Sequence, residues 1–349
     1  MTYRPVASYF PASIDACGSW RMFYPKLYLP GARFLFTEGM PPMDEISEAD
    51  VAIVQRMMME GNLRWIQIMR AHGIKIIYDL DDNLWNLPNL NPAKRVFAKE
   101  EHKQGLENCA EWADVFTVST KELQRVVRMQ WRHLRNVVTK KPIPVMICEN
   151  RIPLTLYQRQ EGIDYNHEGV VIGWSGSDTH AGDLFDIWKI MYRMLEEFPE
   201  VRVELVGQPP PRFLAEHPRV TIRQWVHISE YPARAASWNW DIVLAPLEDH
   251  KFNKSKSSIR MQECGALKRP CLATSIDPYD YFVSKGDSSL KFLLCVASWQ
   301  WEQKLRELIT NASLRKELGE AMYANTRDNF RIELSIPEWE EAINAAYNA

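Results

Sequence analysis

The stretch FNKSKSSIRMQECGALKRPCLATS, residues 252–275, follows the apolar run DIVLAPL at residues 241–247. It begins polar and cationic, continues as an amphipathic segment with one acid, and ends in a second apolar run. An apolar run, a polar loop, a helical segment and another apolar run are typical of parallel strands joined by crossover helices. The same alternation continues on both sides, so the sequence predicts an α/β fold.

The alternation occurs twice along the chain. In the first half we expect strands at residues 6–10, 32–36, 49–55, 74–80, 114–119 and 144–150, and helices near 19–28, 60–72, 98–112 and 120–136. In the second half we expect strands at 169–175, 201–207, 220–226, 241–247, 270–275 and 289–295, and helices near 183–198, 231–238, 256–267 and 298–310. The polar stretch 158–169 separates the two halves and lacks apolar periodicity.

This pattern predicts two Rossmann-like domains, residues 1–160 and 168–330, that face each other across a cleft. Residues 331–349 are expected to form a C-terminal helix that packs back on the first domain. Open parallel sheets bind ligands beyond the carboxyl ends of their strands, so the cleft between the domains is the expected site.

Composition narrows the class of protein. With 349 residues, 46% of them hydrophobic, the chain can bury two ordinary cores. A net charge of -3 excludes a uniformly basic nucleic-acid coat but not a local basic patch. The six cysteines form no C-x-x-C pair, and we see neither a signal-peptide pattern nor an apolar run long enough to span a membrane. We therefore expect a cytoplasmic protein, with peripheral membrane attachment as an option.

The opening stretch has the chemistry of a phosphate site. We expect a helix to begin near Ser257, where several hydroxyls can act as N-caps. Lys254 and Lys256 add positive charge to that helix N-terminus, which favours a phosphate. Glu263 lies seven residues beyond Lys256, roughly 10 Å along the helix, so it could accept the ribose hydroxyls of a nucleoside diphosphate. The alternative is a capped, solvated helix whose charged side chains point to water.

The run PLEDHKFNKSKSSIRMQECGALKRPCLATSIDPY, residues 246–279, resembles the donor-binding segment of retaining GT-B glycosyltransferases, especially family 4. In that family two glutamates eight positions apart flank the helix start, and the second holds the ribose. Glu263 matches the second glutamate. Ser255 replaces the first, so the contacts that this glutamate would make to the transferred sugar are not expected here. CGSWRMFYP at residues 17–25, KIIYDLDDNLWNLP at 75–88 and VVIGWSGSDTHAGDL at 170–184 agree with the resemblance.

The resemblance implies transfer of a sugar from a UDP- or GDP-sugar to a hydroxyl acceptor, with retention and without a metal or other cofactor. On the donor side we expect Gly173, Ser175 and Ser177, which follow a strand and precede a helix, to approach the phosphates. The resemblance places Trp225 beside the nucleobase, although a core tryptophan is the alternative. Family members usually carry an arginine and a lysine near residues 173–180. This chain has Trp174, Ser175, Ser177 and His180 there instead, so the resemblance implies that Lys256 bears more of the diphosphate charge.

On the acceptor side, Asp81 and Asp82 end the strand at 74–80, and Gly18 and Arg21 lie on the first strand–helix loop. Asp82 is a candidate proton acceptor, which makes Lys256, Glu263 and Asp82 the expected catalytic set. Two alternatives stay open. The aspartates could cap the following turn, or they could form the D-x-D metal site of a GT-A glycosyltransferase, a reading that leaves the second domain unexplained.

Residues 121–141 are strongly basic. Arg125, Arg128, Arg132 and Arg135 recur at three- and four-residue steps, which predicts one cationic helix face. Such a face could meet an anionic membrane surface or a nucleic acid, or it could simply be solvated. The acceptor could accordingly be a glycan, lipid, protein or modified base of phage DNA. Other readings are nucleotide-sugar epimerisation, and a catalytically weak protein that binds nucleotide sugars or nucleic acid.

Overall fold

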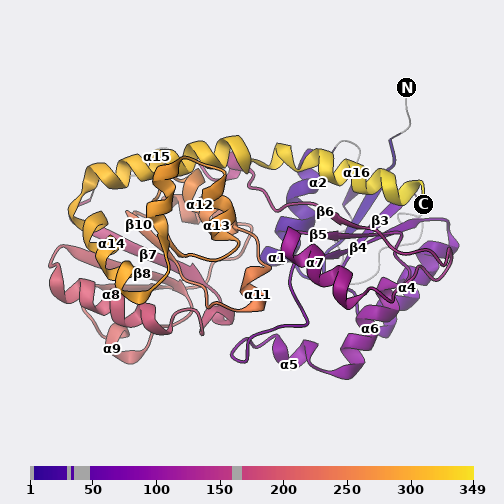
Figure 1. Ribbon diagram of the computed structural model, residues 1–349, viewed down its shortest axis with the longest axis horizontal. Coiled ribbons are helices and arrows are strands. Elements are labelled where there is room, and N and C mark those ends of the chain that lie inside the picture. The colour runs from indigo at the N-terminus through magenta and orange to yellow at the C-terminus, as the bar shows by residue number, and fades with distance from the viewer. Residues whose placement is uncertain (1–3, 30–32, 35–47, 159–166) are drawn as a thin grey trace.

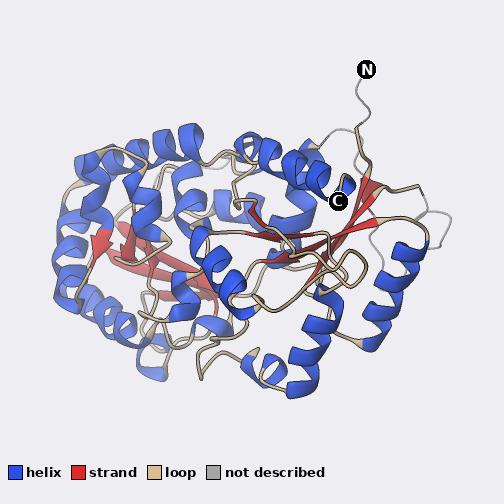
Figure 2. Ribbon diagram, turned by 45° about the vertical axis from the view of Figure 1, so that its right-hand side comes forward, coloured by secondary structure: helices blue, strands red, loops and turns tan. Residues whose placement is uncertain are grey.

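The computed structural model describes residues 4–29, 33–34, 48–158 and 167–349. Each half of the chain forms one six-stranded parallel sheet. The order of the first is β2-β1-β3-β4-β5-β6 and that of the second is β12-β11-β10-β7-β8-β9. Helices cover both faces of each sheet (Figure 2). This confirms the predicted α/β architecture of two facing Rossmann-like halves.

The strands are short, and several of them are fully buried. Those of the first sheet are β1 (Ala7–Phe10), β2 (Arg33–Phe34), β3 (Val51–Gln55), β4 (Lys75–Leu80), β5 (Val115–Val118) and β6 (Val145–Ile147). Those of the second are β7 (Val170–Gly176), β8 (Val201–Gly207), β9 (Val220–Arg223), β10 (Ile242–Ala245), β11 (Cys271–Thr274) and β12 (Leu294–Cys295). Every residue of β3 and β7 is buried, as expected where helices cover both faces of a parallel sheet.

Most helical elements lie in the connections between strands, and the last four follow β12. In the first half they are α1 (Ala16–Gly18), the π-helical turn η1 (Ser19–Phe23), α2 (Tyr24–Tyr28), α4 (Glu60–Ala71), α5 (Lys94–Phe97), α6 (Glu100–Ala110), α7 (Lys121–Gln130) and η2 (Leu154–Leu156). In the second half they are η3 (Asp178–His180), α8 (Phe185–Glu197), α9 (Arg212–Ala215), α10 (Tyr231–Ser237), α11 (Lys251–Lys254), α12 (Ile259–Ala266), α13 (Tyr279–Ser284), η4 (Ser288–Leu293), α14 (Ser298–Thr310), α15 (Ala312–Asn329), η5 (Ile332–Leu334) and α16 (Ile336–Tyr347). No helix among the described residues is long and apolar enough to cross a membrane.

Three local expectations were wrong. The strand predicted at residues 289–295 is mostly the 3-10 helix η4, because the Asp287 side chain accepts a hydrogen bond from the Ser289 N–H and starts a turn. The helix predicted over 120–136 ends at Gln130. Helix α15 was not predicted, since its buried face includes Gly319, Asn325 and Thr326 and so has weak apolar periodicity. Most of the expected linker at 158–169 lies outside the described residues.

The C-terminal helices bridge the two halves. Figure 1 shows α15 and α16 running one after the other along one side of the molecule, from the second half to the first. Helix α15 packs closely on α12, where a Cβ at Gly265 would lie 2.1 Å from Thr326 Oγ1. Helix α16 buries Trp339, Ala342 and Ile343 in a core shared with the first sheet. The chain therefore ends on the domain where it began.

A buried ion pair lies beneath the first sheet's loops. Arg21 and Asp79 are both fully buried, and Arg21 donates to Asp79 from Nη2 at 2.7 Å and from Nε at 3.1 Å. Arg21 Nη1 also donates to Asn150 Oδ1 at 2.8 Å, and Thr117 Oγ1 donates to Asp79 at 2.7 Å. Good hydrogen bonds of this kind offset the desolvation of both charges.

Removal of one partner should therefore be costly. Arg21→Met is expected to lower the free energy of unfolding by about 3–5 kcal/mol, because it leaves the Asp79 carboxylate buried without its counter-ion. Arg64→Met, which breaks the exposed pair with Glu60, should cost less than about 1 kcal/mol. Urea titration of both variants checks this prediction, and equal losses would contradict it.

Candidate functional site

The segment between α11 and α12 joins the two halves. Figure 1 shows α11 lying between the two sheets. From the first half, Thr120 Oγ1 donates to the Ser255 carbonyl at 2.9 Å and Asn83 Nδ2 donates to Ser255 Oγ at 3.2 Å. Asn150 Nδ2 donates to Ser257 Oγ at 3.1 Å. Ser255 is fully buried in these contacts, so its side chain forms part of the interdomain junction.

Helix α12 begins later than predicted, and its N-terminus is not capped by a serine hydroxyl. The predicted helix over 256–267 is divided into α11 and α12, and α12 begins at Ile259, two residues later than Ser257. Ser258 occupies the N-cap position without capping a backbone N–H, because its hydroxyl accepts instead from Gln262 Nε2 at 3.1 Å. The first N–H groups of α12 thus lack a side-chain cap and suit an anion.

The two lysines have different surroundings. Lys254 ends α11, is 45% exposed and pairs with Asp249 at 2.5 Å, so it does not lie at the mouth of α12. Lys256 lies in the segment that the first half contacts at Ser255 and Ser257, and it lines a pocket formed by both halves. Lys256 is therefore the better placed of the two to bind a phosphate across the cleft.

Glu263 is buried and fully engaged. Its side chain is 8% exposed, and its carboxylate accepts from Tyr157 Oη at 3.0 Å, Arg260 Nη1 at 2.9 Å and Tyr231 Oη at 3.5 Å. Burial raises the pKa of Glu263, and Arg260 acts against that rise. The structure excludes the alternative of a solvated glutamate. Sequence reasoning missed the three donors, although the i,i+3 spacing of Arg260 and Glu263 was a readable signal.

The carboxyl end of β7, which includes Ser175, and the loop after it lie beside this network. Ser175 is buried, its Oγ lies 3.0 Å from Tyr231 Oη, and its carbonyl accepts from Arg260 Nη2 at 2.7 Å. Ser177 starts the following turn, with its Oγ 2.6 Å from Thr179 Oγ1. Gly173 instead lies inside β7, where a Cβ would lie 1.9 Å from Trp240, so it serves packing and the expected phosphate contact is wrong for this residue.

Trp225 lies on the surface beyond the end of β9, and it is 61% exposed. Its ring packs against Gly207, where a Cβ would lie 2.9 Å from the indole. The alternative of a core tryptophan is thereby excluded, and the exposed ring stays available for stacking.

His180 in the loop after β7 is held as a neutral imidazole. Its Nδ1 lies 2.8 Å from Asp183 Oδ2, and Asp183 Oδ1 accepts from the Glu248 N–H and from Asn253 Nδ2. Burial lowers the pKa of His180 to about 4, and the charge of Lys256 adds to this effect. At neutral pH His180 therefore adds no positive charge to the cleft, and Lys256 and Arg260 are the cations whose charges act on it.

On the opposite side, Asp81 and Asp82 lie at the carboxyl end of β4. Arg56 Nε is 3.6 Å from Asp81 Oδ1, and Arg56 Nη1 is 3.9 Å from Asp82 Oδ2. Burial raises the pKa of Asp82 to about 6, with the Asp81 charge as the next cause. Asp82 thus lies near Lys256 and can hold a proton at mildly acidic pH.

Cys17, Asp81 and Asp82 have ligand atoms within 4.8 Å of one another, a grouping that could hold a metal ion. Arg56 already supplies positive charge there, and burial raises the pKa of the Cys17 thiol, so the group fits a cation poorly. The D-x-D motif of the metal-site alternative is Asp79-Leu80-Asp81. This alternative fails, because the Asp79 carboxylate is buried in its ion pair with Arg21 and cannot bind a metal ion in the cleft.

The two other residues expected on the acceptor side are Arg21 and Gly18. Arg21 is fully buried and bound to Asp79, so its expected contact with phosphate or acceptor is wrong. Gly18 allows a close approach, since a Cβ there would lie 1.9 Å from the Ser13 carbonyl oxygen. Its role is to let the first loop fold tightly.

The expected cationic helix face is interrupted. Arg125 pairs with Glu122 at 2.7 Å and Arg128 donates to the Val145 carbonyl at 3.3 Å. Arg132 and Arg135 lie beyond the end of α7, and Arg135 donates to the Arg132 carbonyl at 2.9 Å. All four arginines are exposed, so contact with a polyanion stays a prediction.

Comparison with known proteins supports the fold. No protein-family model and no curated protein sequence matches the chain. Among solved structures, a glycosyltransferase from Rickettsia africae ESF-5 aligns over 100% of both chains with 12% identity and a TM-score of 0.64. At this identity the likeness shows a shared fold: the two-domain GT-B arrangement.

Two further structures share this fold. A mutant of S. aureus TarM in complex with Fondaparinux, alpha-GlcNAc-glycerol and UDP aligns with 12% identity and a TM-score of 0.58 over 84% of this chain. The chain spans about half of TarM, 55% of its length. A putative UDP-N-acetylglucosamine 2-epimerase from Listeria monocytogenes aligns over 99% of this chain and 97% of its own, with 12% identity and a TM-score of 0.55.

The raised pKa of Asp82 has a measurable consequence. Between about pH 4 and pH 6 the folded protein keeps a proton that the unfolded chain has lost, so this carboxyl's contribution to stability falls as pH rises, by at most about 3 kcal/mol. Asp82→Asn should remove that fall. Urea midpoints at pH 4.5 and 6.5 test it, with Asp186→Asn, a change at an exposed position of α8, as a control that should leave the wild-type profile unchanged. Parallel profiles for wild type and Asp82→Asn would rule it out.

Proposed function

We propose that this protein transfers a sugar from a nucleotide diphosphate donor, a UDP- or GDP-sugar, to a hydroxyl acceptor, with retention and without a metal. One observation carries the proposal. Glu263 is a buried carboxylate on α12, and the uncapped N-terminus of the same helix lies next to Lys256 in the interdomain cleft. An anion site and a hydrogen-bond acceptor at this separation suit the diphosphate and ribose of one nucleotide.

The donor would lie along the second domain. The ribose hydroxyls would donate to Glu263 in place of Tyr157 or Tyr231, whose hydroxyls are the neutral donors to that carboxylate. Arg260 would keep its bond to Glu263 and hold the carboxylate ionised. The nucleobase would stack on the exposed ring of Trp225, beyond the end of β9.

The chemistry is a single exchange of bonds at the anomeric carbon. The acceptor oxygen forms a bond to that carbon, the bond from the carbon to the diphosphate oxygen breaks, and the acceptor proton passes to the departing diphosphate or to Asp82. Lys256 and the N–H groups of α12 stabilise the negative charge that develops on the leaving group. Closure of the two halves over the donor excludes water and limits hydrolysis.

Ser255 sets this chain apart from the family it resembles. Its hydroxyl donates to the Lys251 carbonyl at 3.0 Å and accepts from Asn83, so it offers no free group to a donor sugar. In our proposal, contacts to the transferred sugar come instead from backbone groups at residues 256–258 and from the loop after β7.

Epimerisation of a nucleotide sugar is the second candidate, because the fold is shared with a putative epimerase over nearly the full length of both chains. The two reactions differ in their need for an acceptor. Conversion of a UDP-sugar in the absence of any acceptor indicates epimerisation, and UDP release that depends on an acceptor indicates transfer.

The first step is to find the donor. A thermal-shift screen of UDP, GDP and their sugars should show one nucleotide series that stabilises the protein, since a ligand at a hundredfold its dissociation constant adds roughly 2.7 kcal/mol. No stabilisation by any nucleotide would contradict the proposed function.

Variants of the cleft test the assignment. Glu263→Ala should weaken binding of the identified nucleotide by about 10- to 100-fold, since hydrogen bonds to charged groups contribute about 1.5–3 kcal/mol. Lys256→Ala should mostly lower turnover. Glu320→Ala, which changes an exposed glutamate paired with Lys268, is the matched control. Calorimetry and sugar-transfer rates measure both effects, and unchanged values in both cleft variants would refute the assignment.

A further inference from the structure

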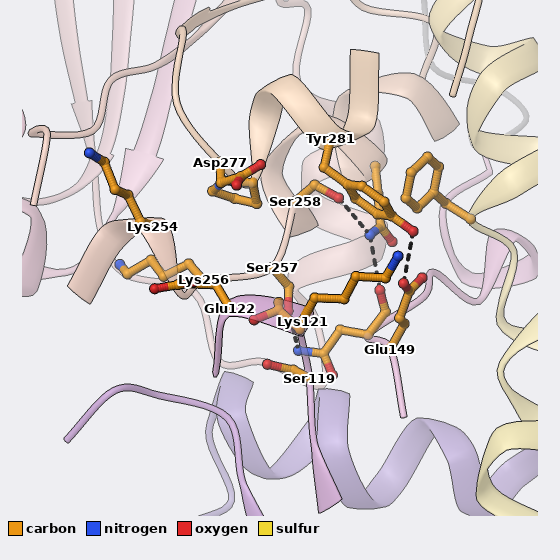
Figure 3. Close-up of a pocket in the computed structure, with 15 residues that line it drawn as sticks. Ser119, Lys121, Glu122, Glu149, Lys254, Lys256, Ser257, Ser258, Asp277 and Tyr281 are labelled. Atoms are coloured by element: carbon orange, nitrogen blue, oxygen red, sulfur yellow. Dashed lines mark hydrogen bonds between the residues drawn. The ribbon is translucent and has the colours of Figure 1, made fainter. Parts of the chain in front are cut away.

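A small pocket lies beside the α11–α12 segment. It has a volume of about 130 Å³ and is formed by both halves of the chain. The first half contributes Ser119, Thr120, Lys121, Glu122, Glu149 and Asn150, and the second half contributes Lys254, Lys256, Ser257, Ser258, Gln262, Asp277, Pro278, Tyr281 and Phe330. Figure 3 shows this pocket from close by.

The pocket's charges balance. Three lysines, Lys121, Lys254 and Lys256, face three acids, Glu122, Glu149 and Asp277. Several are already paired: Glu122 with Arg125, Lys254 with Asp249, and Glu149 with the Tyr281 hydroxyl at 2.8 Å and with Arg151 at 3.0 Å. In Figure 3, Lys254 and Lys256 extend away from Tyr281 and Glu149. Arg151 also pairs with Glu338 at 2.8 Å. When the ion-pair partners outside the pocket are counted with the lining, the positive and negative charges cancel, so the lining favours neither an anion nor a cation.

Gln262 supplies an unused acceptor. It is 1% exposed, and its Nε2 donates to the Asn150 carbonyl at 2.9 Å and to Ser258 Oγ at 3.1 Å. Its Oε1 is buried and has no hydrogen-bond donor among the described residues. A buried acceptor without a donor is destabilising, so a ligand hydroxyl that reached it would offset that cost.

The rest of the wall is aromatic. Tyr281 and Phe330 line the pocket with their rings 6.0 Å apart and nearly perpendicular. Aromatic surface combined with a few placed polar groups is typical of sites for small organic ligands. A volume of about 130 Å³ is well below the roughly 300 Å³ at which drug-sized sites begin, so a whole nucleotide does not fit.

We propose that this pocket binds the acceptor as a neutral, polyhydroxylated unit about the size of one sugar ring. The proposal rests on the proposed function and names the substrate class for the acceptor side of the same site. Lys256 and Ser257 line the pocket, and α12, whose N-terminus is the proposed diphosphate position, begins two residues after Ser257. An acceptor held here presents its hydroxyl next to the diphosphate position, with Gln262 fixing another hydroxyl.

Saturation-transfer NMR with saturating UDP present tests the proposal. The neutral probes are glycerol and the methyl α-glycosides of glucose, galactose and mannose, and the charged probes are glucose 6-phosphate, glucuronate and glucosamine. At least one neutral probe should bind, with UDP causing no displacement. Charged probes should bind at least about tenfold more weakly, because they bring an unpaired charge into a balanced pocket.

Three variants locate the binding. Lys121 is exposed at the pocket's rim, and Figure 3 shows it reaching toward Tyr281 and Glu149, so Lys121→Trp should fill the pocket and abolish the signal without disturbing the core. Lys103→Trp, an equivalent change at an exposed position of α6, should leave it intact. Gln262→Leu should reduce binding by about tenfold, the effect of one lost hydrogen bond.

Each other result overturns the pocket's assignment: no neutral probe binds, a charged probe binds as well, UDP displaces the probe, or Lys121→Trp keeps the signal. Calorimetry with UDP alone reports separately on the proposed function. Failure of UDP to bind would refute that function. The neutral probes, measured without UDP, would still show whether the pocket binds a neutral sugar-sized ligand.

Discussion

The buried carboxylate of Glu263 constrains the junction between the two halves. An ionised carboxylate is costly to remove from water unless hydrogen bonds replace its hydration. Here the donors come from three places: Tyr157 just before the second half begins, Tyr231 on α10 and Arg260 on α12 itself. The chain around Tyr157, helix α10 and helix α12 must therefore all be in place for this carboxylate to receive its three hydrogen bonds.

Polar contacts from several loops cross the same junction, beside the apolar side chains of Trp20 and Tyr24 that pack in the core of the second half. Asn150 connects the buried ion pair to the junction. It accepts a hydrogen bond from Arg21 and donates one to Ser257, between α11 and α12. Asn83 and Thr120 bind Ser255 from neighbouring loops of the first sheet. Polar contacts exchange with water more easily than a packed apolar interface does, so a junction of this type suits two domains that close over a ligand.

The alternation of apolar and amphipathic segments was enough to predict the twelve strands that the structure describes, because strands of parallel sheets are short, apolar and separated by helices of regular length. The last predicted strand was too long: only Leu294–Cys295 form β12, because the Asp287 side chain accepts a hydrogen bond from the Ser289 N–H and the residues before β12 form η4. Glu263 was recognised by its spacing from the cationic segment, and its burial agrees with a specific role.

Other site residues could not be placed from sequence, since their positions depend on distant partners. Arg21 is buried because Asp79, fifty-eight residues away, pairs with it. Ser255 is covered by Asn83 and Thr120 from loops of the other half. Local spacing carries no information about such contacts. Gly173 was misassigned for a similar reason, because only the fold brings Trp240 against it.

A crystal structure with bound UDP is the most direct test of the role of Glu263. We predict a ribose hydroxyl within hydrogen-bond distance of a Glu263 carboxylate oxygen, in place of one tyrosine hydroxyl, with the diphosphate at the N-terminus of α12 beside Lys256. A nucleotide bound elsewhere, or a Glu263 that keeps all three protein donors and makes no contact with UDP, would contradict it.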